Sequence, residues 1–133
     1  MTLALIVFIL FPSPKVATLD AHRMAESIRM VENSGWRQRG RDGEWGAFQI
    51  MPNVWQRHSR ARQWNAPEWE QRRVALAHLA DLRAGLRRNG MPESPYLLGL
   101  CWNAGLDAAV RHSAPARAKD YAIRCQNIYE DQP

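Results

Sequence analysis

Residues 68–88, EWEQRRVALAHLADLRAGLRR, carry the clearest structural pattern in the chain. Their apolar residues recur every three or four positions and form one stripe, made of Ala75, Leu79, Leu82 and Leu86 and widened by Val74 and Leu76. This period is typical of an amphipathic helix that packs one face on a core. Asn89-Gly90 and Pro92 follow as stop signals. The pattern therefore predicts a helix over Glu68–Arg88 in a mainly α fold.

Helical patterns also follow this stretch on its C-terminal side. Ser94-Pro95 is typical of a helix start, because serine caps the first turn and proline fits the first helical position. We expect that helix to run through residues 96–103, followed by a short helix or turn over residues 107–112. A last helix is predicted to start near Pro115, and its inner face would comprise Ala118, Tyr121, Ala122, Cys125 and Tyr129.

On the N-terminal side, the pattern predicts one helix and then a long irregular segment. Apolar residues recur at helical spacing through Leu19–Asn33, with Asp20 placed to cap the start and Gly35 placed for a left-handed C-cap. Four glycines then fall within 12 residues, which predicts a loop or a short β-hairpin near residues 40–50. A short helix is expected to begin at Pro52. No other run alternates as a strand would, so the predicted fold is a small, mainly α single domain.

Length and charge limit the classes of protein to be considered. A chain of 133 residues and 15.3 kDa holds one domain, which excludes a (β/α)₈ barrel of ~250 residues. The net charge of +5 suits an anionic partner such as nucleic acid, a membrane surface or a cell-wall polymer. The four histidines lie far apart in the sequence, and no HExxH or CxxC motif occurs. We therefore expect no metal and no other cofactor.

The first 18 residues differ in composition from the rest. Thr2–Phe11 is an apolar run whose length suits the core of an export signal and falls short of the ~20 residues of a membrane span. We expect residues 1–18 to form a signal or N-terminal apolar segment, and residues 19–133 to form the domain. Export would place the protein in the periplasm or outside the cell. The alternative is that the apolar run packs on the domain itself.

Four short blocks stand out along the domain. They are residues 31–36 (VENSGW), residues 43–52 (GEWGAFQIMP), residues 101–105 (CWNAG) and Tyr121-Ala122. In this order they resemble the blocks Glu-Ser-Gly-Phe, Gly-Ala-x-Gly-Leu-Met-Gln-Ile-Met-Pro, Ala-Tyr-Asn-Ala-Gly and Tyr-Val of the lytic transglycosylases of the soluble (Slt) type, which are related to goose-type lysozyme. The resemblance covers most of the chain from Leu19 to Tyr129. It implies a small lysozyme-like α domain.

The resemblance also implies a role for each of six residues. Glu32 would be the catalytic acid and base, and Tyr121 would lie near its carboxylate. The sugar site would have Gln49 and Met51 on one wall, and Trp102 and Asn103 on the opposite wall. The reaction implied is cleavage of the β-1,4 bond between N-acetylmuramic acid and N-acetylglucosamine, with a 1,6-anhydro product. The enzyme would be a monomer, and its partner would be the glycan strand of peptidoglycan.

The sequence departs from the family pattern at a few positions in these blocks. Asn33 follows the glutamate where the family has serine, Gly40 and Arg41 stand near a further family serine, and Trp102 replaces a tyrosine. The implied fold also packs the helices of Cys101 and Cys125 together. Two alternatives remain for Cys101 and Cys125: they form a disulfide after export, or they are two free, buried thiols.

Several alternatives remain open from the residues alone. Asp42 or Glu44 could supply a second carboxylate for a hydrolytic muramidase, or both could be solvated loop acids. A lysozyme-like domain could bind peptidoglycan without cutting it. Three tryptophans either stack on sugar rings or pack in the core, namely Trp36, Trp45 and Trp55.

The arginines raise a different class of function. Six of them crowd one region and could clamp the phosphates of nucleic acid, namely Arg37, Arg39, Arg41, Arg57, Arg60 and Arg62. No recognition-helix or zinc-finger pattern accompanies them, so nucleic acid is not the expected partner. The biological setting stays open among wall remodelling, an envelope-spanning secretion or conjugation apparatus, and a phage.

Overall fold

The structure, a computed structural model, describes residues 17–133. The predicted export segment therefore lies outside the described residues, except for its last two. Within the described residues the helices are α1 (Ala21–Glu32), α2 (Pro52–His58), α3 (Glu68–Arg88), α4 (Pro95–Ala104), α5 (Leu106–Val110) and α6 (Ala116–Asp131), with a 3₁₀ turn, η1, at Gln63–Asn65. This part of the chain contains no sheet. The prediction of a mainly α fold is confirmed.

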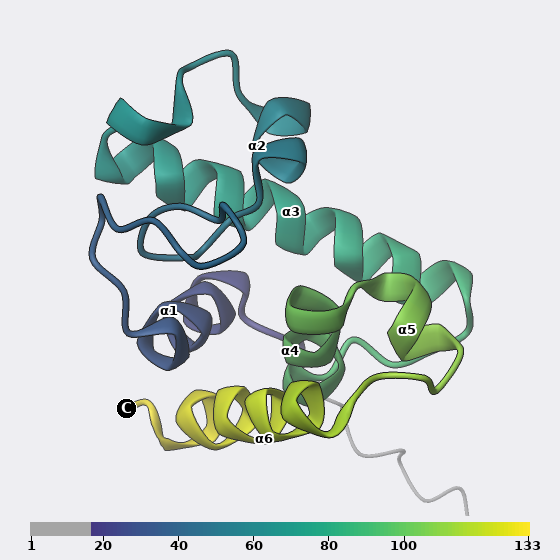
Figure 1. The fold of residues 1–133 in the computed structure, drawn as a ribbon. Helices are drawn as coiled ribbons and strands as arrows, with labels where there is room; N and C mark the ends of the chain where they lie inside the picture. Colours follow the sequence, from purple (N-terminus) through teal and green to yellow (C-terminus); the bar gives the residue numbers. More distant parts are fainter. Residues whose placement is uncertain (1–16) are drawn as a thin grey trace, which may run out of the picture.

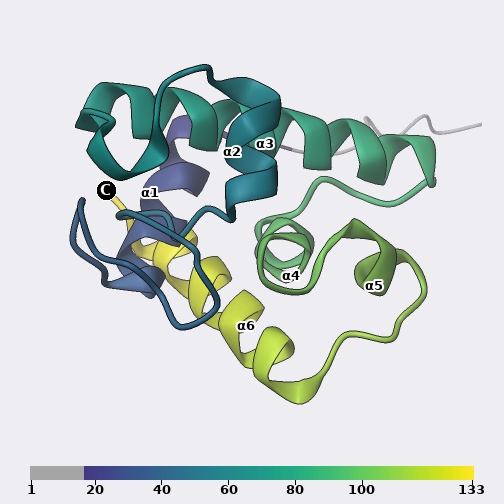
Figure 2. The same cartoon turned by 45° about the horizontal axis from the view of Figure 1, so that its top comes forward.

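Helices α1 and α4 lie in the middle of the fold, between α3 and α6 (Figure 1). In Figure 1, α3 runs along one side, α6 runs along the other, and α1 and α4 lie between. The apolar stripe of each helix faces this interior, where the largest fully buried side chains include Phe48, Met24, Ile28, Leu79 and Leu98. Figure 2 shows α5 beside α4, and the loop of residues 34–51 beside α1. The C-terminal ends of α1 and α4 thus approach α6 and that loop.

Both ends of α1 are fixed by local hydrogen bonds. The Asp20 side chain accepts from the Arg23 N–H at 3.1 Å, which confirms the predicted N-cap. At the other end Asn33 takes the left-handed conformation with φ 47°, so the prediction that Gly35 forms this cap is wrong. Asparagine tolerates this conformation better than other residues with a side chain, and it ends the helix two residues earlier. Glu32 is therefore the last residue of α1.

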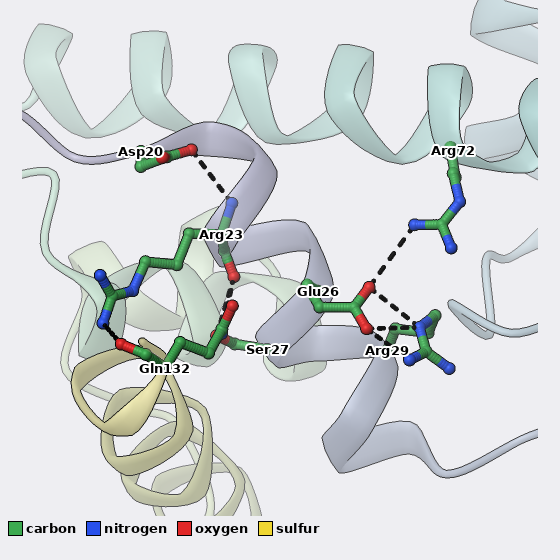
Figure 3. A network of polar contacts seen from close by, with 7 residues as sticks. All are labelled: Asp20, Arg23, Glu26, Ser27, Arg29, Arg72 and Gln132. Carbon is green, nitrogen blue, oxygen red and sulfur yellow. Dashed lines mark hydrogen bonds and ion pairs between the residues drawn. The ribbon is translucent and has the colours of Figure 1, made fainter.

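Polar contacts join α1 to its neighbours on two sides, as Figure 3 shows. The Arg23 guanidinium donates to the carbonyl oxygens of Tyr129, Glu130 and Gln132 at the end of α6. On the other side of the helix, the Glu26 carboxylate pairs with Arg29 on α1 and with Arg72 on α3. These contacts hold α1 between α3 and α6.

The glycine-rich segment forms tight turns and no regular hairpin. Only two isolated antiparallel bridges occur among its residues, Arg39 with Trp45 and Trp45 with Ile50. Three residues have positive φ: Gly43 (94°), Gly46 (84°) and Gln49 (48°). Because the backbone reverses every few residues, no stretch is long enough for a ladder of hydrogen bonds. The predicted β-hairpin near residues 40–50 is therefore reduced to these two bridges.

Helices α4 and α6 approach each other closely at Gly99. A Cβ built on this glycine would lie 3.0 Å from the Cys125 Cβ and 3.2 Å from the Ala122 Cα. Cys101 and Cys125 are both buried, and both are free thiols. Burial raises the pKa of the Cys101 thiol to about 11. Burial, with the charge of Glu32 as a second cause, raises the pKa of Cys125 to about 12. Of the two alternatives left open by the sequence, the structure has the free thiols.

Candidate active site

Glu32 occupies the C-terminal end of α1 and is largely shielded from solvent. The Tyr121 hydroxyl on α6 donates a hydrogen bond of 2.7 Å to Glu32 Oε1. Burial is the main influence on this carboxyl group and raises its pKa above the ordinary value. The charge of Glu44 raises the pKa further, whereas the Tyr121 hydrogen bond and the charge of Arg124 lower it. The net effect is a pKa above that of a free glutamate.

A cleft of about 460 Å³ opens beside this carboxyl group. All six residues assigned a role from the sequence line it, namely Glu32, Gln49, Met51, Trp102, Asn103 and Tyr121. They come from four parts of the chain: the end of α1, the glycine-rich loop, the end of α4 and the middle of α6. A protonated carboxyl group on the wall of an open cleft can donate its proton to a leaving oxygen bound there.

Gln49 holds the glycine-rich loop in place on one wall of the cleft. Its side-chain amide nitrogen lies within hydrogen-bond distance of Ser34 Oγ (3.0 Å), the Gln38 carbonyl oxygen (3.1 Å) and the Gly46 carbonyl oxygen (2.7 Å). Its amide oxygen faces Gly40, because a Cβ built there would lie only 2.2 Å from it. Gln49 therefore both lines the cleft and sets the shape of the loop that carries it.

Gln71 on α3 also holds the glycine-rich loop in place, through hydrogen bonds to its backbone. This buried side chain accepts from the Ala47 N–H at 3.2 Å and donates to the carbonyl oxygens of Trp36 (2.8 Å) and Ala66 (3.2 Å). The sequence interpretation did not single it out. The signal was nevertheless present, because Gln71 lies three and four residues before the apolar residues Val74 and Ala75 and so occupies the buried stripe.

The end of α4 also lines the cleft. The Trp102 indole N–H donates to the Phe48 carbonyl oxygen at 3.2 Å, which ties the end of α4 to the loop. Asn103 is exposed at the next position, and Met51, which lines the same cleft, is 41% exposed. These three residues also line a second cleft of about 570 Å³, which runs between α2, α3 and α4. The two clefts are therefore adjacent, and Met51, Trp102 and Asn103 line both of them.

Four further charged residues line the cleft beside Glu32. Asp42 and Glu44 come from the loop, and Arg117 and Arg124 come from α6. Neither arginine was predicted from the sequence, although the spacing of Arg117, Tyr121 and Arg124 places all three on one helix face. The cleft therefore presents both signs of charge around the carboxyl group.

The three tryptophans considered for sugar stacking lie away from Glu32. Trp55 is 2% exposed and belongs to the core, and Trp36 packs edge-on against Phe48 with ring centroids 5.9 Å apart. Trp45 lines a separate depression next to Trp64. None of the three lines the Glu32 cleft, so the core alternative holds for Trp36 and Trp55. Among the tryptophans of residues 17–133, Trp102 lines this cleft.

The six arginines that suggested an anionic partner are all exposed. Within residues 17–133, none of them forms an ion pair with an acidic side chain. Three of them, Arg37, Arg39 and Arg41, belong to the segment that carries the cleft wall. Their free charge suits the attraction of an anionic polymer.

The chain matches no protein-family model, no curated protein and no solved structure. Among the helices of residues 17–133, none combines the length and the apolar composition that crossing a bilayer requires. One group of described side chains could hold a metal ion, and it lies between α2 and α3 rather than beside Glu32.

Proposed function

We propose that this protein is a lysozyme-like lytic transglycosylase that cleaves the glycan strand of peptidoglycan. The substrate bond is the β-1,4 linkage between N-acetylmuramic acid and N-acetylglucosamine. The observation that carries the proposal is the shielded Glu32 carboxyl group, with its raised pKa, on the wall of a cleft. The six residues named from the sequence resemblance all line this same cleft, which supports their joint role.

One carboxyl group can serve both halves of the proposed reaction. Protonated Glu32 gives its proton to the glycosidic oxygen, and the substrate's own N-acetyl group stabilises the positive centre, as in substrate-assisted glycosidases. The ionised Glu32 then takes the proton from the 6-hydroxyl of the muramyl residue. That hydroxyl oxygen bonds to the anomeric carbon and gives the 1,6-anhydro product. Tyr121, which donates to Oε1, stabilises the ionised form between the two halves.

A hydrolytic muramidase is the second candidate, and one observation favours it. Asp42 and Glu44 line the same cleft as Glu32, so a second carboxylate is available to position water. Inverting glycosidases place their two carboxyl groups far enough apart to hold a water molecule between them. The product separates the two candidates, since an anhydro end is one water lighter than a reducing end.

The proposed substrate also defines a setting for the protein. Peptidoglycan lies outside the cytoplasmic membrane, so we propose a periplasmic or secreted location and a monomer that works on the wall. Wall remodelling, passage of a secretion or conjugation apparatus, and phage entry would all use this reaction.

The proposal is tested by incubating purified sacculi with the chain and analysing the released muropeptides by mass spectrometry. We expect 1,6-anhydro ends from the unmodified chain and none from Glu32→Gln. The matched control is Glu130→Gln, because Glu130 is an exposed glutamate on α6 outside the cleft and its replacement should leave activity intact. Binding to sacculi without release of product would overturn the enzymatic proposal and indicate a glycan-binding domain.

A further inference from the structure

Three side chains with metal-binding atoms meet between α2 and α3. They are His58 at the end of α2, and His78 and Asp81 on α3. One nitrogen of each histidine and one oxygen of Asp81 all lie within 4.8 Å of one another, and His58 Nε2 is 2.9 Å from Asp81 Oδ2. His78 and Asp81 share a helix face because they are three residues apart. The two histidines, although 20 residues apart in the sequence, are therefore neighbours in space.

The backbone at His58 is held by a polar network around the buried Glu70 side chain. The Glu70 carboxylate accepts from the Ser59 hydroxyl at 2.8 Å and pairs with Arg73. Arg73 in turn donates to the His58 carbonyl oxygen at 2.7 Å. These bonds attach the end of α2 to α3. They place His58 close to His78 and involve no atom of the His58 imidazole.

The imidazole nitrogens in this group lack ordinary partners. His58 Nε2 and His78 Nδ1 are buried and accept or donate no hydrogen bond within residues 17–133. The contact of His58 Nε2 with Asp81 is close in distance but is not aligned as a hydrogen bond. The unpaired nitrogens of the two rings are therefore available to coordinate an ion.

We propose that His58, His78 and Asp81 bind one zinc ion between α2 and α3. Two imidazoles with one carboxylate form a ligand set that zinc uses, and three protein ligands leave a fourth position open. Tetrahedral zinc ligands at 2.0–2.1 Å stand about 3.4 Å apart, a separation that small side-chain rotations reach from the present spacing. Calcium and magnesium prefer oxygen ligands, so a site with two nitrogens selects against them.

The zinc site borders the larger of the two clefts. His78 and Asp81 line that cleft together with Arg57, and the His78 ring packs against Trp102 with centroids 5.0 Å apart. The positive charge of Arg57 works against any cation held by charge alone. It would favour an anion as the fourth ligand of a zinc ion that is held by coordination bonds. The proposal does not depend on glycan cleavage, because zinc binding is measured without substrate.

The test is a calorimetric titration of the full, tag-free chain with zinc chloride after removal of metals by a chelator. We expect one zinc per chain, and tetrahedral absorption bands when cobalt(II) replaces zinc. Asp81→Asn and His58→Gln should each weaken binding by at least about tenfold, since even outer-shell partners of a metal site contribute that much. Asp81 is exposed and isosteric with asparagine, so this variant should fold.

The matched control is His22→Gln, an exposed histidine on α1 outside this group. It should leave the zinc affinity unchanged. The proposal is overturned if the unmodified chain shows no saturable binding below about 100 µM zinc, or if Asp81→Asn and His58→Gln bind as tightly as the unmodified chain. In either case the contact between His58 and Asp81 has no role in metal binding.

Discussion

Tyr121 Oη donates a 2.7 Å hydrogen bond to Glu32 Oε1 and so joins α6 to the end of α1 across 89 positions of sequence. The phenol is itself buried, and burial together with the neighbouring Glu32 raises its pKa well above the ordinary value. Tyr121 therefore stays protonated and acts as the donor in this pair. Burial and this hydrogen bond act in opposite directions on the pKa of Glu32, and each can be removed separately.

The first prediction concerns the stability of Glu32→Gln. Because the pKa of Glu32 is raised on folding, its protonated form is favoured in the folded state. This stabilisation is complete below the pKa of an unfolded glutamate and is lost as the pH rises through the folded value. Glutamine mimics the protonated acid, so the variant should melt at a higher temperature than the unmodified chain near pH 7.

Thermal melting followed by circular dichroism measures this difference. It should shrink toward zero as the buffer is lowered to about pH 3, below the pKa of an unfolded glutamate, where both states of the unmodified chain carry a protonated Glu32. A difference that does not change with pH would contradict the raised pKa. Glu130→Gln serves again as the control, because its glutamate is exposed.

The second prediction concerns Tyr121→Phe. This change removes the donor that stabilises ionised Glu32, so the pKa of Glu32 should rise further. The descending limb of the pH–activity profile should then move to higher pH, because more of the acid stays protonated. Loss of the hydrogen bond should also cost about 1 kcal/mol in the free energy of unfolding.

Release of soluble muropeptides across a pH series would reveal the shift, and urea unfolding would give the free energy. Tyr96→Phe on α4 is the matched control, because Tyr96 is half-buried and lies outside the Glu32 cleft. An unchanged profile for Tyr121→Phe would show that the phenol does not influence the acid.

The third prediction concerns Gly40, whose α-carbon lies against two cleft side chains. A Cβ on this residue would lie 2.2 Å from both Gln49 Oε1 and Glu44 Oε1. Gly40→Ala should displace both side-chain ends and lower kcat/KM by at least about tenfold, since small misplacements in a site are costly. Gly35→Ala is the control, because a Cβ on Gly35 would lie no closer than 3.7 Å to any neighbouring atom. This variant should keep its activity. Equal activity of the two variants would contradict this account of the loop.

The fourth prediction concerns the thiols. Burial raises the pKa of Cys101 to about 11 and that of Cys125 to about 12, so neither should form a thiolate near pH 8. We expect Ellman's reagent to detect no thiol in the native chain and two in denaturant. No thiol in denaturant would show instead that the two cysteines had formed a disulfide.

The helices were predictable because their signals are local. The helices α1, α3 and α6 followed from apolar spacing, and α2 and α4 followed from start signals at Pro52 and Ser94-Pro95. Asp20 and Ser94 act as the N-caps that the sequence predicted. The glycine-rich loop was not predictable in detail, because its shape depends on a distant residue. Gln71 on α3 fixes the Ala47 and Trp36 backbone, and no pattern within residues 34–51 indicates this support.

In the candidate site, too, local motifs were predictable and contacts between distant segments were not. The residue types around Glu32 were predicted from short motifs, but their approach to one cleft depends on helix packing. The group of His58, His78 and Asp81 was missed because its members were judged by their separation along the sequence. Only the packing of α2 on α3 makes the two histidines neighbours.

The contacts between α1 and the end of α6 also order events during folding. Arg23 bonds to backbone carbonyls of residues more than 100 positions later. A nascent chain on the ribosome therefore exposes Glu32 long before Tyr121 and the latching carbonyls have been synthesised. Such long-range contacts close late. A truncated chain without α6 would lack the Tyr121 donor to Glu32, so the proposed activity would require the docked α6 helix.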